Sequence, residues 1–295
     1  MVTTNPAVTV RGLSKGYSGT RAVDGIDLDI EQGEVFALLG PNGAGKTTTV
    51  EILEGYRKRD AGEVTVLGQD PGRPGQDWRS RIGIVLQNTG GHDDLTVHEV
   101  VHHFSGYYPN AREPEDVIAA VGLDDKHKTR VRHLSGGQRR RLDVALGILG
   151  RPELLFLDEP TTGFDPEARR EFWGLVSSLA DDGTTILLTT HYLDEAEHLA
   201  GRVGIIAGGR IVALDTPAEL GGRADEQATV RWMTPDGPRE EASAEPTQLI
   251  TELSSRFGGE VPGLTVSRPT LEDVYLRLIG ESADASRPSE NLEHA

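Results

Sequence analysis

The chain has 295 residues, of which 36% are hydrophobic and 26% are charged, and this length suits roughly two globular domains. Its net charge of −17 argues against a nucleic-acid partner, because broad binding to nucleic acid requires a basic surface. The lack of cysteine excludes disulfides and thiolate metal sites and suits a reducing cytosol, and no apolar run approaches the ~20 residues of a membrane span.

Short β-rich runs alternate with helical patterns over the first 220 residues. Their near-continuous apolar character predicts strands of a parallel sheet that is buried on both faces. These runs lie at residues 35–40, 63–68, 81–87, 153–158 and 184–190. The segments VGIIA and RIVALD flank Gly208-Gly209 and predict a hairpin. Residues from about 88 to 150 have a helical pattern, which we interpret as an insert within the sheet domain.

The character of the chain changes after Gly221-Gly222, where a polar stretch rich in Pro and Glu begins. Strand-like ATVRWM and LTVSR and two helical patterns predict a small α+β domain over 221–280, followed by a disordered tail over 281–295. The last helix is expected to begin after Thr270, which can form a cap with Asp273, and to stop at Gly280. Its amphipathic stripe favours packing on its own small domain over a partner surface.

The strongest signal for a site is GPNGAGKTT at residues 40–48, which follows an apolar strand and precedes a helical run. It fits G-x-x-x-x-G-K-[ST], whose glycines let the backbone curl around phosphates. We expect Lys46 to reach the β- and γ-phosphates and Thr47 to ligate Mg²⁺. The predicted nucleotide contacts of this phosphate loop are Gly40, Pro41, Asn42, Gly43, Ala44, Gly45, Lys46, Thr47 and Thr48.

Two carboxylates end the apolar strand LLFLDEP at residues 154–160. Acids at a strand end are costly unless a cation compensates them, and Mg²⁺ on a nucleotide would do so. Asp158 is therefore predicted on the metal side, and Glu159 is predicted to act as the general base for an attacking water. His191 follows the next strand and could donate to the γ-phosphate, although a helix-capping role would suit a lone histidine.

A second phosphate-binding pattern appears in HLSGGQRRRLD at residues 133–143, where a serine and two glycines open a helix. Together with the phosphate loop, LLFLDEP and His191, it makes the chain resemble the ATP-binding-cassette ATPases over about residues 7–220. The resemblance implies ATP and Mg²⁺ as ligands, Tyr17 stacked on adenine, and Gln87 in contact with Mg²⁺ and water.

The fold class implied by this resemblance is α/β. It combines a P-loop NTPase cassette over residues 1–220, with a parallel core sheet, an antiparallel β portion and a helical insert, and the small C-terminal domain. In this family two cassettes face head to tail, so the chain is expected to pair with a second copy of itself. The resemblance places Ser135, Gly136, Gly137, Gln138 and Asp165 on the partner's ATP.

A narrower resemblance lies in QRRRLDVALGILGRPELLFLDEPTTGFDP and TLEDVYLRL, which look like the ATPase subunits of bacterial exporters of the daunorubicin-resistance type. It implies ATP hydrolysis at the cytoplasmic face of the cell membrane, powering export of drugs or antibiotics through a separate membrane permease. The insert after Gln87 is the expected docking region. The alternatives are a soluble cassette protein in translation or DNA repair, and a P-loop kinase, which would leave LSGGQ unexplained.

The segment His98–His102 reads H-E-V-V-H and matches the zinc-protease pattern H-E-x-x-H. The third ligand is missing, because Ser105 stands where the extended pattern has glycine and no glutamate falls about twenty residues on. Thr96 and Glu99 also match a capping box, which explains the glutamate by helix initiation. Zinc catalysis is therefore set aside.

Three consecutive arginines, Arg139, Arg140 and Arg141, follow LSGGQ. They fit a solvated helix face and a role near phosphates equally well. Both interpretations stay open at this point.

Overall fold

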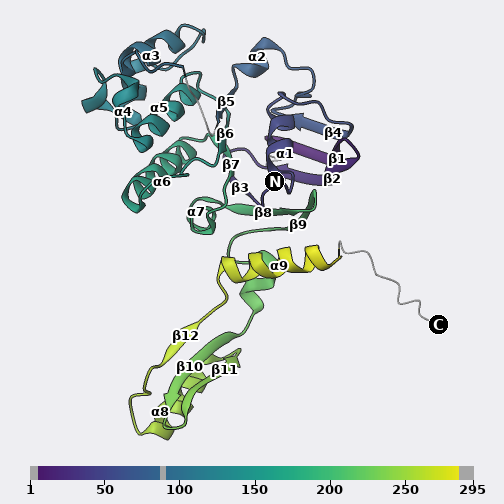
Figure 1. Cartoon of the computed structure of the whole chain (residues 1–295), viewed down its shortest axis with the longest axis vertical. Helices are drawn as coiled ribbons and strands as arrows, with labels where there is room; N and C mark the ends of the chain where they lie inside the picture. Colours follow the sequence, from purple (N-terminus) through teal and green to yellow (C-terminus); the bar gives the residue numbers. More distant parts are fainter. Residues whose placement is uncertain (1–5, 87–90, 286–295) are drawn as a thin grey trace, which may run out of the picture.

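The computed structural model describes residues 6–86 and 91–285. Its largest sheet has six strands in the order β5-β6-β7-β3-β8-β9 (Figure 1). The strands are Ile82–Val85 (β5), Leu154–Asp158 (β6), Thr185–Thr189 (β7), Val35–Leu39 (β3), Arg202–Ala207 (β8) and Arg210–Asp215 (β9). The first five run parallel, and β9 pairs antiparallel with β8 as a hairpin. The predicted parallel core sheet and hairpin are confirmed.

A second sheet is antiparallel, in the order β2-β1-β4, with β1 at Val8–Tyr17, β2 at Thr20–Ile30 and β4 at Ala61–Val66. The prediction that the run at 63–68 joins the parallel sheet is therefore wrong. Its side chains alternate between buried Val64 and Val66 and exposed Glu63 and Thr65, as expected for a strand with one solvated face.

Helix α1 (Lys46–Leu53) packs between the two sheets. Its Val50, Ile52 and Leu53 share one core cluster with residues of the antiparallel sheet and of β3. The short helix α2 (Gln76–Arg79) buries Trp78, whose Nε1 donates to the backbone oxygen of Val66 at 2.9 Å. Trp78 thus adds a buried aromatic ring to the same core cluster, next to Val66 of β4.

The remaining helices of the first 220 residues pack around a second core cluster on the other face of the large sheet. The segment predicted as a helical insert contains α3 (Val97–Ser105), α4 (Pro114–Ala120), α5 (Gly136–Ile148) and two short 3₁₀ turns. Helices α6 (Pro166–Asp181) and α7 (Leu193–Leu199) follow β6 and β7. In Figure 1, α3, α4 and α5 form a group beside β5 and β6. No helix within 6–86 and 91–285 combines the length and apolar character needed to cross a membrane.

The C-terminal part contains a three-stranded antiparallel sheet that lies apart from the large sheet (Figure 1). Its strands β10 (Ala228–Thr234), β11 (Gly237–Ser243) and β12 (Thr265–Ser267) are covered by α8 (Pro246–Phe257). A small core of Val230, Trp232, Leu253 and Val261 holds them together. The boundaries at 220 and 280 stay a prediction.

The last helix, α9 (Leu271–Ala285), returns to the first part of the chain. Leu271 belongs to the core cluster of the large sheet and its helices, and α9 contacts α7, β8, β9 and the 3₁₀ turn at Leu220–Asp225. The prediction that α9 packs on its own small domain is therefore wrong, because its apolar stripe completes another core.

The predicted cap of α9 is present: the Thr270 backbone nitrogen donates to Asp273 at 2.8 Å, and Asp273 nitrogen donates to the Thr270 hydroxyl at 3.2 Å. The predicted stop at Gly280 is wrong, since the helix runs on to Ala285. A single glycine costs a helix only ~1 kcal/mol, which the neighbouring turns can offset. Residues 281–285 of the predicted disordered tail are thus helical, and 286–295 lie outside the described residues.

Candidate active site

A pocket of about 270 Å³ opens where β3 and β6 end. It is lined by Tyr17, Ala22, Asn42, Gly43, Gly45, Lys46, Thr47, Thr48, Asp158 and Glu159. The structure therefore brings together the predicted aromatic residue, most of the phosphate loop and both predicted carboxylates. These come from three segments that are far apart in the sequence. The carboxyl ends of parallel strands are where α/β sheets bind ligands.

The phosphate loop curls tightly because glycine alone fits two of its positions. A Cβ on Gly40 would lie 2.3 Å from the backbone oxygen of Ile206, and a Cβ on Gly45 would lie 2.3 Å from that of Ala22. Gly45 also has a φ of 108° and is the N-cap of α1. The loop thus presents its backbone N–H groups and the positive end of the α1 dipole to the pocket, which suits an anion.

Lys46 supplies a cation inside the loop. Its buried Nζ donates to the backbone oxygens of Gly40 at 2.6 Å and Pro41 at 3.2 Å. Burial lowers the pKa of this ammonium group, while the charges of Glu159 and Asp158 oppose that effect. A buried cation with two nearby carboxylates is chemically suited to hold a polyphosphate and its metal.

The two carboxylates are fixed by β7. Asp158 Oδ1 accepts from the Thr189 hydroxyl at 2.5 Å, and the Glu159 backbone nitrogen donates to the Thr189 backbone oxygen at 3.0 Å. Glu159 has a φ of 44°, which is uncommon for a residue with a side chain and typical of functional sites. Its Oε2 lies 3.4 Å from His191 Nδ1. The predicted base and the predicted histidine are therefore neighbours.

His191 is not a helix cap, since the N-cap of α7 is Tyr192 and no side chain caps that helix end. Gln87 lies outside the described residues. Of the other predicted residues, Gly40, Pro41, Ala44 and His191 do not line the pocket, whereas Ala22 lines it without having been predicted.

The signature segment, which we define as residues 134–138, does not line this pocket. Ser135 accepts from the Gln138 backbone nitrogen at 3.2 Å, and Gln138 Oε1 accepts from the Ser135 nitrogen at 3.1 Å, so the pair caps α5. Asp165 likewise caps α6 by accepting from the backbone nitrogens of Glu167 and Ala168. Ser135 and Gly136 are exposed. The segment is therefore open to a ligand brought from outside the chain.

Arg140 is a functional candidate whose role the sequence analysis left open between a solvated helix face and a place near phosphates. Its side chain donates to the backbone oxygens of Asp158 at 2.6 Å, Pro160 at 3.1 Å and Leu86. The solvated-face interpretation is wrong here, because Arg140 is only 6% exposed. The signal was its position four residues before Val144 on the buried face of α5.

The two flanking arginines behave differently. Arg139 forms an ion pair with Asp93 at 3.0 Å, and Arg141 pairs with Glu171 on α6. Arg140 alone of the three connects α5, which follows the signature segment, to the strand end that carries Asp158 and Glu159.

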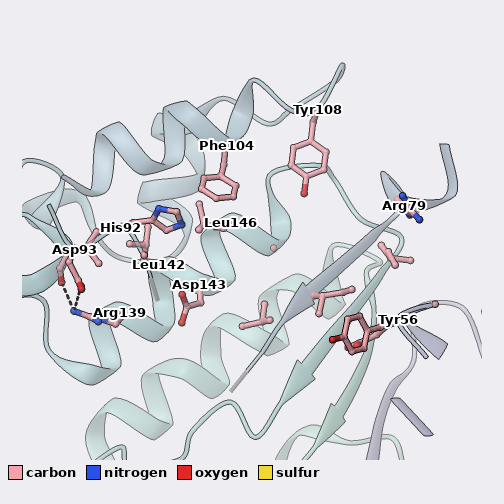
Figure 2. A pocket seen from close by; sticks show the side chains of 18 residues that line it. Tyr56, Arg79, His92, Asp93, Phe104, Tyr108, Arg139, Leu142, Asp143 and Leu146 are labelled. Atoms are coloured by element: carbon pink, nitrogen blue, oxygen red, sulfur yellow. Dashed lines mark hydrogen bonds and ion pairs between the residues drawn. The ribbon is translucent and has the colours of Figure 1, made fainter. Parts of the chain in front are cut away.

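A larger groove of about 740 Å³ lies between the core sheet and the insert (Figure 2). Figure 2 shows Phe104 and Tyr108 above it, Tyr56 at one end, and Arg139 joined to Asp93 at the other. Glu54 is only 8% exposed in its wall. Burial raises the pKa of this carboxyl to about 8, with further repulsion from Asp158 and Glu51.

Replacing Glu54 by glutamine should stabilise the chain at alkaline pH. The Glu54 pKa of about 8 in the folded state lies above the ordinary 4.5, so the glutamate costs nothing below pH 4.5 and costs increasingly more as the pH rises toward 8. At 1.36 kcal/mol per pKa unit, and with allowance for relaxation, Glu54→Gln should gain on the order of 3 kcal/mol at pH 8.5. Urea unfolding of both proteins from pH 5 to pH 9 measures this, and a difference independent of pH would contradict it.

Comparisons with known proteins identify the family of the chain. Residues 23–162 match the family described as ABC transporter. The chain is 39% identical to the daunorubicin resistance ATP-binding protein DrrA3 of Streptomyces coeruleorubidus, over 93% of this chain and 96% of the relative. It is 38% identical to the Nod factor export ATP-binding protein I of Ralstonia nicotianae, over 93% of this chain and 94% of the relative.

The fold has a solved counterpart as well. A dimeric post-hydrolysis state of an ATP-binding cassette, bound to ADP and Pi, matches with a TM-score of 0.64 at 24% identity and covers 71% of this chain and 98% of that chain. The sequence similarity extends over nearly the whole length of two ATP-binding proteins named for resistance and export. The chain therefore belongs to the ABC transporter family, as the ATP-binding and ATP-hydrolysing subunit of an exporter.

Proposed function

We propose that two copies of the chain close head to tail over two MgATP molecules and drive drug export through a separate membrane permease. The observation that carries this proposal is the separation of the two phosphate-binding elements within one chain. The phosphate loop lines the pocket with Asp158 and Glu159, whereas the signature segment does not line it and exposes Ser135 and Gly136. Each nucleotide is then held by one copy's loop and the other copy's signature segment.

The residues in and beside the pocket divide the proposed hydrolysis among them. Lys46 and the loop nitrogens hold the β- and γ-phosphates, and Glu159 accepts a proton from the attacking water. His191, at 3.4 Å from Glu159, orients that carboxylate and donates to the γ-phosphate. The Thr47 hydroxyl and Asp158 line one pocket and offer the oxygen ligands that Mg²⁺ prefers, and Gln87 would join them. Magnesium held there would neutralise part of the phosphate charge.

The groove between the core sheet and the insert is the proposed docking site for the permease. It combines the exposed apolar surface of Tyr56 and Ile84 with the buried carboxyl of Glu54, whose raised pKa keeps it mostly uncharged at neutral pH. A short permease segment with apolar side chains would match it, since burial of apolar surface favours association.

Tyr56→Asp should reduce recovery of the permease with the chain by about tenfold or more, because it introduces a charge at the mouth of the groove. Tyr107→Asp is the matched control: Tyr107 is 67% exposed against 79% for Tyr56 and does not line the groove. Co-purification from cells that express both subunits measures the effect, with ATP binding checked in parallel. Equal loss in both variants, or membrane association without any permease, would count against docking here.

Drugs are the favoured cargo, because the chain is 39% identical to a daunorubicin resistance ATP-binding protein. Its 38% identity to a Nod factor export protein supports the second candidate, a Nod factor. Drug export is tested by measuring how much daunorubicin accumulates in cells that express the chain with its permease, which should be less than in cells without them. The same accumulation with wild type and with Lys46→Ala would contradict drug export.

Tyr17 is the proposed adenine platform. It is half-exposed at the end of β1, and the charged groups of Arg57 and Lys15 lie 5.3 and 5.6 Å from its ring centre. Tyr17→Ala should weaken ATP binding by ~1–3 kcal/mol through lost base stacking, whereas Tyr17→Phe should keep most of the affinity. Calorimetric titration with ATP measures both. An unchanged dissociation constant for the alanine variant would show that the base lies elsewhere.

A further inference from the structure

Two histidines and a glutamate meet between α3 and α4, outside the nucleotide pocket. His98 and His102 are one turn apart on α3, and Glu115 lies in the first turn of α4. Glu115 Oε1 is 2.8 Å from His102 Nε2 and 3.4 Å from His98 Nε2. One possible ligand atom from each of the three side chains lies within 4.8 Å of the others. No other group of this kind occurs in the described ranges 6–86 and 91–285.

We propose that His98, His102 and Glu115 bind a divalent transition metal of the zinc type. Imidazole nitrogens and one carboxylate oxygen are typical zinc ligands, with bonds of about 2.0–2.2 Å. A tetrahedral ion with such bonds holds its ligand atoms about 3.3 Å apart. The distances of 2.8 and 3.4 Å to Glu115 are already near that value, and all three ligand atoms lie within 4.8 Å of one another, so side-chain shifts can bring them onto one ion.

The third ligand comes from a second helix, which is why the sequence pattern did not contain it. Glu115 follows His102 by 13 residues, and the chain between them turns back so that α4 packs on α3. The His98 and His102 rings are 4.1 Å apart, and His127 lies 5.2 Å from His98. His127 is not part of the group of ligand atoms, so water would take a fourth position.

The middle glutamate of the H-E-x-x-H pattern has another task. Glu99 Oε2 accepts from the Thr96 backbone nitrogen at 2.8 Å and from the Thr96 hydroxyl at 2.9 Å. This capping box, which was predicted, directs the carboxylate to the start of α3. The general base that a zinc protease needs is thus engaged elsewhere, and the site is suited to binding rather than to peptide hydrolysis.

The bound metal would join α3 to α4. Phe104, near the end of α3, lines the large groove, so a fixed α3 also fixes one wall of that groove. A ligand that binds only the folded chain raises its stability with concentration. Zinc binding at these three residues requires neither a nucleotide nor a permease, and it stands or falls separately from the proposed function.

Calorimetric titration of the full chain with zinc chloride at pH 7.5 tests the site. We expect one equivalent to bind to the wild type, and the dissociation constant to rise at least about tenfold in His102→Gln and in Glu115→Gln. His103→Gln is the matched control, since this neighbour contacts Tyr107 instead and should keep wild-type affinity. Both substituted positions are substantially exposed, so folding should be retained.

A second measurement separates this site from binding elsewhere on the chain. Zinc should raise the melting temperature of the wild type and of His103→Gln, and should raise that of Glu115→Gln clearly less at the same zinc concentration. No zinc binding to the wild type up to millimolar concentration would overturn the proposal. Equal affinity in the wild type, His102→Gln and Glu115→Gln would do so as well.

Discussion

Glu159→Gln should reduce ATP turnover by ~10²–10⁴ while leaving ATP binding intact. The amide has almost the same shape as the carboxylate and can keep contacts with Thr162 and His191, but it cannot accept a proton from water. Phosphate release by the purified variant measures turnover. Glu252→Gln, at an exposed position of α8, is the control and should hydrolyse ATP at the wild-type rate.

The same variant should accumulate as an ATP-bound dimer, because nucleotide trapped between two copies favours association. Adding Gly137→Asp should disperse it, since a carboxylate would face the γ-phosphate of the other copy. The site has room: a Cβ on Gly137 would lie 3.6 Å from Ala168 Cβ and 4.0 Å from Phe164 Cζ. Gly137→Ala, which adds the same Cβ without charge, is the steric control.

Size-exclusion chromatography of these double variants, with and without MgATP, distinguishes the outcomes. Glu159→Gln with Gly137→Ala should remain dimeric, and Glu159→Gln with Gly137→Asp should be a monomer that still binds ATP. A dimer in both would show that the signature segment does not hold the other copy's nucleotide.

Lys46→Ala should abolish measurable hydrolysis and weaken ATP binding. The substitution removes the one charged contact that the phosphate loop offers, and it leaves Asp158 and Glu159 without the cation that compensates them. Phosphate release and ATP titration measure both effects. Lys128→Ala, at an exposed position of the insert, is the control. Hydrolysis at the wild-type rate after Lys46→Ala would show that the loop is not the catalytic phosphate site.

Most residues of the pocket could be predicted because they lie in short continuous segments of the sequence. The phosphate loop and the Asp158-Glu159 pair each follow an apolar strand, and parallel strands bring their ends together. His191 could be placed near them for the same reason, since it follows β7. The contacts of these residues with a second copy could not be predicted in the same way, because they depend on how two chains meet.

The misses have a common physical origin in contacts between distant elements. Arg140 looks like a surface residue until α5 packs against the ends of β5 and β6, where three backbone oxygens accept from it. Glu115 becomes a candidate ligand only when α4 folds onto α3. The alternation in β4 was readable in principle, because Val64 and Val66 flank the polar Thr65.

The return of α9 to the large sheet affects the order in which the chain folds during synthesis. Leu271 is 1% exposed and completes the core that holds β8 and the turn after Leu220. At roughly 5–20 residues per second, the ribosome needs roughly 3–10 s to make the stretch between Leu220 and Leu271. An apolar patch on the nascent cassette stays open for that interval while the small sheet forms. The cassette, although it is synthesised first, therefore completes its core only after the small sheet has been made.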